Sequence, residues 1–143
     1  MLPKEQATEC SHANVPMSEY KRDHPRIRES LPVELITPGN KKLFASTYDV
    51  SKRGIQLSCD GVTVQEIFGV PGPAPPAKLP TVILKLRLSR SSRDAEQIEA
   101  ECKAVFSRRV SEEEYRVGML IHSLSPPARV ALDHFVEAWL ERR

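Results

Sequence analysis

The sequence predicts a small, mainly β protein: a six-stranded antiparallel barrel followed by a C-terminal helix. Two observations support this fold class. Between residues 31 and 123, short stretches alternate apolar and polar residues with the period of a strand, and turn-forming residues separate them. After residue 125 the apolar spacing changes to three and four residues, the period of a helix. Six short strands joined by turns are typical of a small barrel.

Composition limits the classes of protein to consider. The 143 residues are enough for one domain with one core, and 21 Lys and Arg against 19 Asp and Glu give a net charge of +2. This balance disfavours a protein that coats nucleic acid through its overall charge. Three widely spaced cysteines without a C-x-x-C pair favour a reducing cytoplasm over a disulfide scaffold or a metal site. No apolar run approaches the roughly 20 residues that span a bilayer.

The N-terminal part is predicted to precede the folded domain. Residues 1–20 are polar and aperiodic, which predicts a flexible lead, and residues 21–30 form a basic linker. They contain no basic region followed by an apolar stretch, so we expect no secretory signal. Met1 and Met17 are both candidate starts of translation. The remaining chain, residues 21–143, is expected to form one domain of linker, barrel and helix.

The first three strands are predicted from alternation over residues 31–37, 42–50 and 55–59. Between the first two, Pro38-Gly39-Asn40 has the composition of a tight turn, because Pro fixes φ whereas Gly and Asn tolerate a positive φ. Asp60-Gly61 predicts another turn. Farther along the chain, residues 68–76 are predicted to form a loop, because their prolines exclude a helix or a central strand.

Three longer strands complete the predicted barrel, which extends to residue 123. Each has an apolar face with the two-residue period that fits the inside of a barrel. These faces comprise Val82, Leu84, Leu86 and Leu88; Ile98, Ala100, Cys102, Ala104 and Phe106; and Tyr115, Val117, Met119 and Ile121.

A helix is predicted over residues 125–142. Ser125 is a suitable N-cap, and the two prolines after it lie in the first turn, where no backbone donor is needed. Its apolar face consists of Leu132, Phe135, Val136, Trp139 and Leu140. We expect this face to pack on an open side of the barrel; a second possible use of it is to bind a partner.

Two short motifs suggest a binding site for an anionic ligand that contains guanine. Arg22 and Arg26 form an R-x-x-x-R pattern before the first strand, and Asp49, Ser51 and Gly54 form D-x-S-x-x-G between the next two. A guanidinium can donate two hydrogen bonds to guanine O6 and N7, bind a phosphate in a fork, or stack on a purine. Asp49 can accept from guanine N1–H and N2–H, which adenine lacks, and glycine permits a close approach.

Taken together, these motifs make the chain resemble the PilZ domain, the bacterial receptor module for cyclic di-GMP. The resemblance extends over residues 20–143 and includes His24-Pro25-Arg26, the D-x-S-x-x-G turn, the strand Tyr115-Arg116-Val117-Gly118-Met119 and a terminal helix. It implies a six-stranded barrel without catalytic activity or a cofactor. It also implies that the two motif arginines grip the ligand and that the D-x-S-x-x-G turn forms the barrel side of the site.

Two residues beside the motif are further candidates. The position of Lys21, just before the first arginine, is linked in the family to whether one ligand or a stacked pair binds, and Arg28 is a possible helper. The expected function is that of a cytoplasmic receptor, a monomer or homodimer. It would change conformation with cyclic di-GMP and regulate a protein partner in motility, biofilm formation, secretion or virulence. The basic linker would order around the ligand.

Other classes of function compete with this one. A PilZ-like adaptor without a ligand is one alternative, although both motifs are intact here. A small barrel that binds single-stranded nucleic acid is another, but such sites use exposed aromatic residues, and the few aromatics here fall mainly on apolar faces. An enzyme is disfavoured because no combination of nucleophile, base and orienting group is evident, and the four histidines lack metal-ligand spacing.

Overall fold

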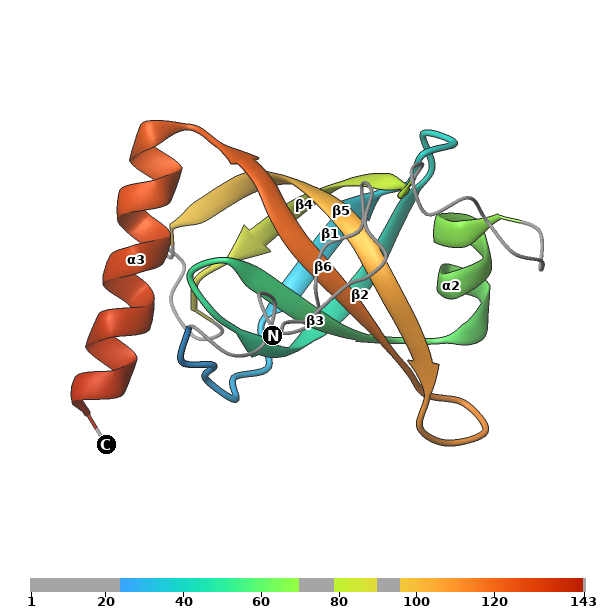
Figure 1. Ribbon diagram of the computed structural model, residues 1–143, viewed down its shortest axis with the longest axis horizontal. Coiled ribbons are helices and arrows are strands. Elements are labelled where there is room, and N and C mark those ends of the chain that lie inside the picture. The colour runs from blue at the N-terminus through green and yellow to red at the C-terminus, as the bar shows by residue number, and fades with distance from the viewer. Residues whose placement is uncertain (1–23, 70–78, 90–95, 143) are drawn as a thin grey trace, which may run out of the picture.

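A computed structural model of the chain describes residues 24–69, 79–89 and 96–142 and confirms the predicted fold class (Figure 1). Six antiparallel strands form a closed barrel in the order β1-β2-β3-β6-β5-β4. The elements are β1 (Pro32–Ile36), β2 (Lys42–Val50), β3 (Gly54–Cys59), α2 (Gly61–Phe68), β4 (Thr81–Arg87), β5 (Gln97–Arg109), β6 (Tyr115–Leu124) and α3 (Pro126–Glu141). Within the described ranges, no helix is long and apolar enough to cross a membrane.

The barrel interior holds the alternating apolar residues of the strands. On β4, Val82, Leu84 and Leu86 are fully buried, as the alternation predicts. Each such side chain contributes about 1.5–3 kcal/mol through its removal from water. The predicted turn between β1 and β2 is also present: Asn40 has a φ of 69° and donates its backbone N–H to Thr37 O at 2.8 Å. Asparagine tolerates this conformation better than most residues.

Helix α2 departs from the prediction, in which Asp60-Gly61 forms a turn that leads to the loop over residues 68–76. Asp60 is instead the N-cap of α2, and its side chain accepts a hydrogen bond from Thr63 N at 2.9 Å. Gly69, with a φ of 81°, ends the helix. The same residue types start turns and cap helices, and the helix has only eight residues, too few for a clear helical period. Most of the predicted loop over residues 68–76 lies outside the described residues.

The prediction that Phe106 lies on the inner face of β5 is wrong. The alternation holds from Ile98 to Ala104, but the register between β5 and β6 then shifts, so that Phe106 pairs with Gly118. Val117 and Met119, on either side of Gly118, are fully buried, so Gly118 and Phe106 lie on the outer face. A β-bulge of this kind reverses the side to which the following residues point.

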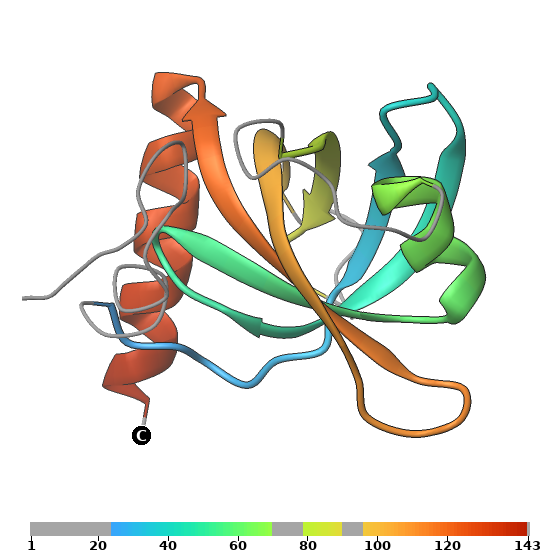
Figure 2. The same ribbon diagram turned by 45° about the vertical axis from the view of Figure 1, so that its right-hand side comes forward.

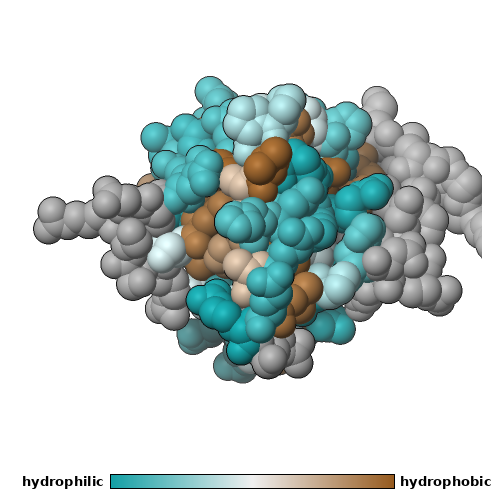
Figure 3. Space-filling model, turned by 90° about the vertical axis from the view of Figure 1, so that its left-hand side faces the viewer, coloured by the Kyte–Doolittle hydropathy of each residue, from teal (hydrophilic) through white to brown (hydrophobic). Residues whose placement is uncertain are grey.

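Helix α3 covers one end of the barrel, opposite the end beside α2 (Figures 1 and 2). Ser125 caps it as predicted, accepting from Ala128 N at 3.2 Å. Leu132 and Val136 are fully buried, and the other predicted apolar residues of α3 pack partly against the core. Seen from this side, the molecule is mainly hydrophilic with scattered apolar side chains (Figure 3). The apolar face of α3 therefore packs on the barrel.

Candidate ligand-binding site

The D-x-S-x-x-G motif forms the tight connection between β2 and β3. The Ser51 hydroxyl is fully buried; it accepts from Gly54 N at 3.0 Å and donates to Gly54 O at 3.1 Å. Ser51 N also donates to Gly54 O at 2.8 Å. Such short-range bonds from a serine side chain fix a turn in one conformation. Ser51 and Gly54 thus set the shape of the barrel surface at this point.

Arg26 joins the two sequence motifs into one site. Its Nε and Nη2 atoms donate to Asp49 Oδ1 at 2.9 and 2.6 Å, and Nη1 lies 3.4 Å from Ser51 Oγ. The side chains of Arg26 and Asp49 are only 14% and 8% exposed. Charge-assisted hydrogen bonds at these distances are among the stronger polar contacts in proteins. The fold therefore places the second arginine of R-x-x-x-R directly on the D-x-S-x-x-G turn.

The residues after Arg26 are attached to the edge of β2. Ile27 and Val50 exchange two backbone hydrogen bonds of 2.8 and 2.9 Å, and Ile27 is fully buried. Leu31 N then donates to Thr47 Oγ1 at 2.9 Å, while the Thr47 hydroxyl donates to Glu29 O. The segment from Arg26 to Leu31 is thus held against the barrel. For the linker residues before Arg26, ordering when the ligand binds stays a prediction.

Two of the predicted site residues, Lys21 and Arg22, lie outside the described residues. Arg28 is described and is exposed, two positions after Arg26 along the attached segment. Because Ile27 between them points into the core, Arg26 and Arg28 lie on the same side of this extended stretch.

A row of outer-face residues extends the site across four strands. Asp49 pairs with Gln56, Gln56 with Gly118, and Gly118 with Phe106. Gln56 Nε2 donates to Asp49 Oδ2 at 3.1 Å, so both carboxylate oxygens of Asp49 have a partner. A Cβ atom on Gly118 would overlap the Phe106 ring, so glycine is needed for the ring to lie there.

Sequence reasoning missed this row for two different reasons. Gln56 alternates with the buried Ile55 and Leu57, so its position on the outer face beside Asp49 could have been inferred from the strand period. The outward position of Phe106 could not have been inferred in this way, because it depends on a β-bulge that the alternation of apolar residues does not indicate.

Next to Asp49, the ring of Tyr48 contacts two guanidiniums. The Arg28 Cζ atom lies 3.9 Å from the ring centroid and the Arg116 Cζ atom 3.5 Å from it. Arg116 also pairs with Glu114 at 3.2 Å, and Ser58 Oγ donates to Glu114 Oε2 at 2.6 Å. The hydrogen bond from Ser58, followed by that from Arg116, lowers the pKa of Glu114, because both bonds favour its charged form.

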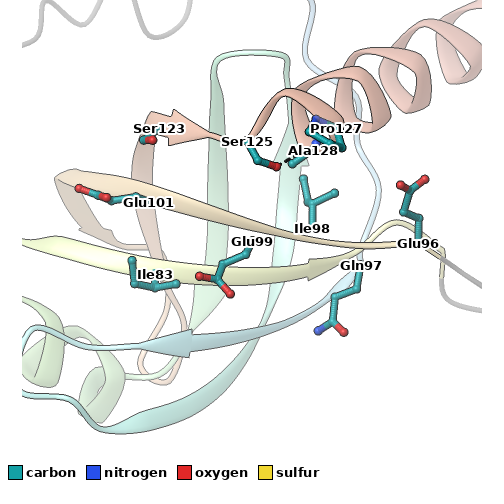
Figure 4. A pocket seen from close by; sticks show the side chains of 10 residues that line it. All are labelled: Ile83, Glu96, Gln97, Ile98, Glu99, Glu101, Ser123, Ser125, Pro127 and Ala128. Carbon is teal, nitrogen blue, oxygen red and sulfur yellow. Dashed lines mark hydrogen bonds between the residues drawn. The ribbon is translucent and has the colours of Figure 1, made fainter.

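A hollow of about 400 Å³ lies elsewhere, between β5 and the start of α3 (Figure 4). Its lining includes Glu96, Glu99 and Glu101 but none of the predicted site residues. Three carboxylates would repel a ligand that carries phosphates. The chemistry of this hollow therefore does not suit the predicted ligand, whereas the surface around Arg26 does.

Comparisons with known proteins agree with this architecture. The family model of the PilZ domain matches residues 20–138. The structure of the inhibitor of motility from Bacillus subtilis has a TM-score of 0.64 and 17% identity, and the match covers 86% of this chain and 53% of that one. No curated protein sequence matches the chain.

Two further structures that resemble this fold were solved in complex with c-di-GMP. For the PlzA protein of Borreliella burgdorferi the TM-score is 0.53 and the identity 18%, with 88% of this chain and 55% of that one covered. For the PilZ domain of YcgR from Escherichia coli the values are 0.52 and 15%, with 85% and 92% covered. The chain thus spans about half the length of the Bacillus and Borreliella proteins. At these identities the likeness shows a shared fold.

Proposed function

The chain belongs to the PilZ domain family, and on that premise we propose that it is a cytoplasmic bacterial receptor for cyclic di-GMP. The observation that supports this most is the contact of Arg26 with Asp49 and Ser51, because it unites the two motifs in one site. The ligand would change the conformation of the protein and so regulate a protein partner. We propose no catalytic step.

Arg26 is suited to bind the ligand because its guanidinium is held in place. Cyclic di-GMP presents two phosphates and two guanines, and a guanidinium can bind either group in a bidentate manner. Asp49 and Ser51 fix the orientation of Arg26 through three contacts of 2.6 to 3.4 Å. A binding group that is ordered in advance loses less entropy when the ligand arrives. Arg22 would add the second guanidinium from the preceding segment.

Asp49 would act mainly through Arg26. Its two carboxylate oxygens accept from Arg26 and Gln56, and the residue is 5% exposed. Direct contact between Asp49 and a guanine edge stays a prediction. Ser51 and Gly54 would keep the turn in the shape that presents this pair.

The signal would reach a partner through α3. Lys52, inside the motif turn, pairs with Glu137 at 2.6 Å, and Arg129 donates to the backbone carbonyl of Lys52. On the linker side, Trp139 Nε1 donates to Glu29 Oε1 at 2.9 Å. Helix α3 thus contacts both halves of the site, so a change in either half would alter its surroundings. Motility, biofilm formation, secretion and virulence are the processes in which we expect the partner.

Isothermal titration calorimetry with cyclic di-GMP tests the proposal on the wild type and on an Arg22→Ala/Arg26→Ala variant. Each lost charge-assisted hydrogen bond costs about 1.5–3 kcal/mol, so the variant should bind about 100-fold more weakly or not at all. An Arg87→Ala/Arg142→Ala variant is the control, because it loses the same charge at exposed positions outside the motifs. Equal affinity in the wild type and the motif variant would refute the site assignment.

A further inference from the structure

Gln56 lies outside both sequence motifs, yet it contacts the carboxylate that holds Arg26. Its Nε2 atom donates to Asp49 Oδ2 at 3.1 Å, while Arg26 donates to Asp49 Oδ1 at 2.9 and 2.6 Å. Gln56 and Asp49 are only 7% and 5% exposed. The three side chains thus form one hydrogen-bonded chain, Gln56–Asp49–Arg26, at the barrel surface.

A β-bulge in β2 brings Asp49 opposite Gln56. Thr47 pairs with Leu57. The next pair is Asp49 with Gln56, so that one residue of β2, Tyr48, is skipped. In regular pairing, Tyr48 rather than Asp49 would lie opposite Gln56. Bulges often re-aim a side chain beside a functional site, and this one allows Gln56 to reach the carboxylate.

The Phe106 ring covers the other side of Gln56. Gly118 pairs with Gln56 on one side and with Phe106 on the other. The ring lies where a side chain of residue 118 would stand, because a Cβ atom on Gly118 would overlap it. Directly opposed Cβ atoms on neighbouring strands are only about 5 Å apart. The ring therefore lies next to Gln56 and limits the access of water to its hydrogen bond with Asp49.

A neutral donor is a suitable partner for the second oxygen of Asp49. The hydrogen bond to Oδ2 restrains rotation of the carboxylate and so fixes the oxygen that accepts from Arg26. Because an amide carries no charge, Gln56 does not compete with Arg26 as a counter-ion, as a lysine or arginine at this position would. A hydrogen bond with little access to water is also electrostatically stronger than one in water. Gln56 can therefore hold Asp49 in place without weakening its attraction for Arg26.

Building on the proposed function, we propose that Gln56 is a positioning residue for the cyclic di-GMP site. It acts through Asp49 and determines how firmly the guanidinium of Arg26 is held before the ligand arrives. A binding group that is ordered in advance loses less entropy on binding. Ligand affinity therefore depends on the hydrogen bond from Gln56, without any contact between Gln56 and the ligand.

Two substitutions separate this hydrogen bond from the shape of the side chain. Gln56→Met keeps an unbranched side chain of similar length without a donor, and Gln56→Glu has a donor only when its carboxyl group is protonated. Gln97→Met and Gln97→Glu are the matched controls, because Gln97 is exposed on β5 and lines the hollow beside α3. Calorimetric titration of each full chain with cyclic di-GMP at pH 8 and pH 5.5 gives Kd. Thermal unfolding checks that each variant is folded.

The pH dependence of Gln56→Glu separates a hydrogen bond from a packing role. At pH 8 the new carboxyl group is charged, so it repels Asp49 and cannot donate. The charge of Asp49 raises the pKa of the new group, so that a proton binds as the pH falls and restores a donor. The other charged groups near this position, Arg26 and Arg116, keep their charge over this range. Comparison with the wild type at the same pH removes the effect of any other group that titrates.

The proposal predicts a different pattern for each substitution. Gln56→Met should raise Kd by about 3- to 10-fold at both pH values, the effect of one hydrogen bond. Gln56→Glu should raise Kd, relative to the wild type, by at least about 10-fold at pH 8 but by no more than about threefold at pH 5.5. Both Gln97 variants should bind as the wild type does.

The two proposals fail in different ways. If folded Gln56→Met keeps the Kd of the wild type, or if Gln56→Glu differs from the wild type by the same factor at both pH values, the positioning role is refuted and the receptor function stands. If Gln56→Glu does not fold at pH 8, Gln56→Met decides alone. If the folded wild type binds no cyclic di-GMP, the receptor function is refuted and the positioning role with it.

Discussion

The contact between Arg26 and Asp49 should be measurable as an energetic coupling in the folded protein. Replacing Arg26 with Ala removes two hydrogen bonds to Asp49 Oδ1 and leaves the carboxylate, which is 8% exposed, hydrogen-bonded to the Gln56 side chain. A buried charge that loses its partner is costly, because the desolvation penalty remains while the attraction is lost. Arg26→Ala should therefore destabilise the fold as well as the ligand site.

The expected size follows from the burial of the pair. Breaking a fully buried ion pair costs 3–5 kcal/mol, and the residual exposure of this pair, 14% and 8%, reduces that to about 2–3 kcal/mol. Asp49→Ala should destabilise the fold less than Arg26→Ala, because Arg26 has a longer side chain and can turn its guanidinium toward water. The double variant Arg26→Ala/Asp49→Ala should cost less than the sum of the single variants, with a coupling energy of about 1.5–3 kcal/mol.

Urea denaturation of the wild type, both single variants and the double variant gives this coupling energy as a double-mutant cycle. Lys41→Ala is the control: its ion pair with Glu66 has side chains 63% and 31% exposed and should contribute less than about 1 kcal/mol. If Arg26→Ala is no more destabilising than Lys41→Ala, or the coupling energy is below about 0.5 kcal/mol, the anchored arginine described above is wrong.

Three further predictions concern the fold. Hydrogen bonds from the Thr63 backbone and side chain lower the pKa of Asp60 from its ordinary value near 3.8. The charged cap therefore stabilises α2 fully at any pH above that ordinary value. Its contribution to stability is lost as the pH falls through the lowered pKa of the folded protein. Asparagine also caps helices but does not titrate, so the Asp60→Asn variant should lose less stability against urea than the wild type when the pH falls from 7 to 2. Equal losses in the two proteins would contradict the role of the Asp60 charge in the cap. Gly118→Ala should destabilise the protein by about 1–3 kcal/mol in urea, because the new methyl group displaces the aromatic ring over it; an unchanged midpoint would place the ring elsewhere. Burial raises the pKa of Cys59 and of Cys102 to about 12, so iodoacetamide at pH 8 should alkylate both far more slowly in the folded protein than in urea, as followed by mass spectrometry; equal rates would show that the thiols are accessible.

The barrel could be predicted because its signal is local and repeated. Leu84 and Leu86 alternate with polar residues, and the face they predict is the face that the barrel buries. Asn40 lies in a turn that its residue type predicts. Where one face of each strand is buried, the two-residue period fixes which side chains point inward, and six such strands leave few alternatives to a barrel.

The missed features depend on information that is not periodic. Asp60-Gly61 begins a helix of eight residues, although the same dipeptide begins many turns. The bulge that turns Phe106 outward consists of one additional residue on β5, between Ala104 and Phe106. Neither feature produces a repeating pattern of apolar residues from which it could be predicted.

The site was partly predictable for a related reason. Arg26, Asp49 and Ser51 belong to recognisable motifs, so their association could be expected before the structure brought them within 3.4 Å. The contact of Arg28 and Arg116 with Tyr48 joins three separate segments and has no motif. Such a cluster becomes visible only once the strand register is known.

Discrimination between two cyclic dinucleotides tests the central claim most directly. The wild-type chain should be titrated with cyclic di-GMP and, under the same conditions, with cyclic di-AMP, which has the same phosphates but lacks the paired O6 and N7 acceptors of guanine. The account predicts saturable binding of cyclic di-GMP and binding of cyclic di-AMP that is at least 100-fold weaker, about 2.7 kcal/mol. Equal affinity for the two ligands, or no binding of cyclic di-GMP, would contradict it.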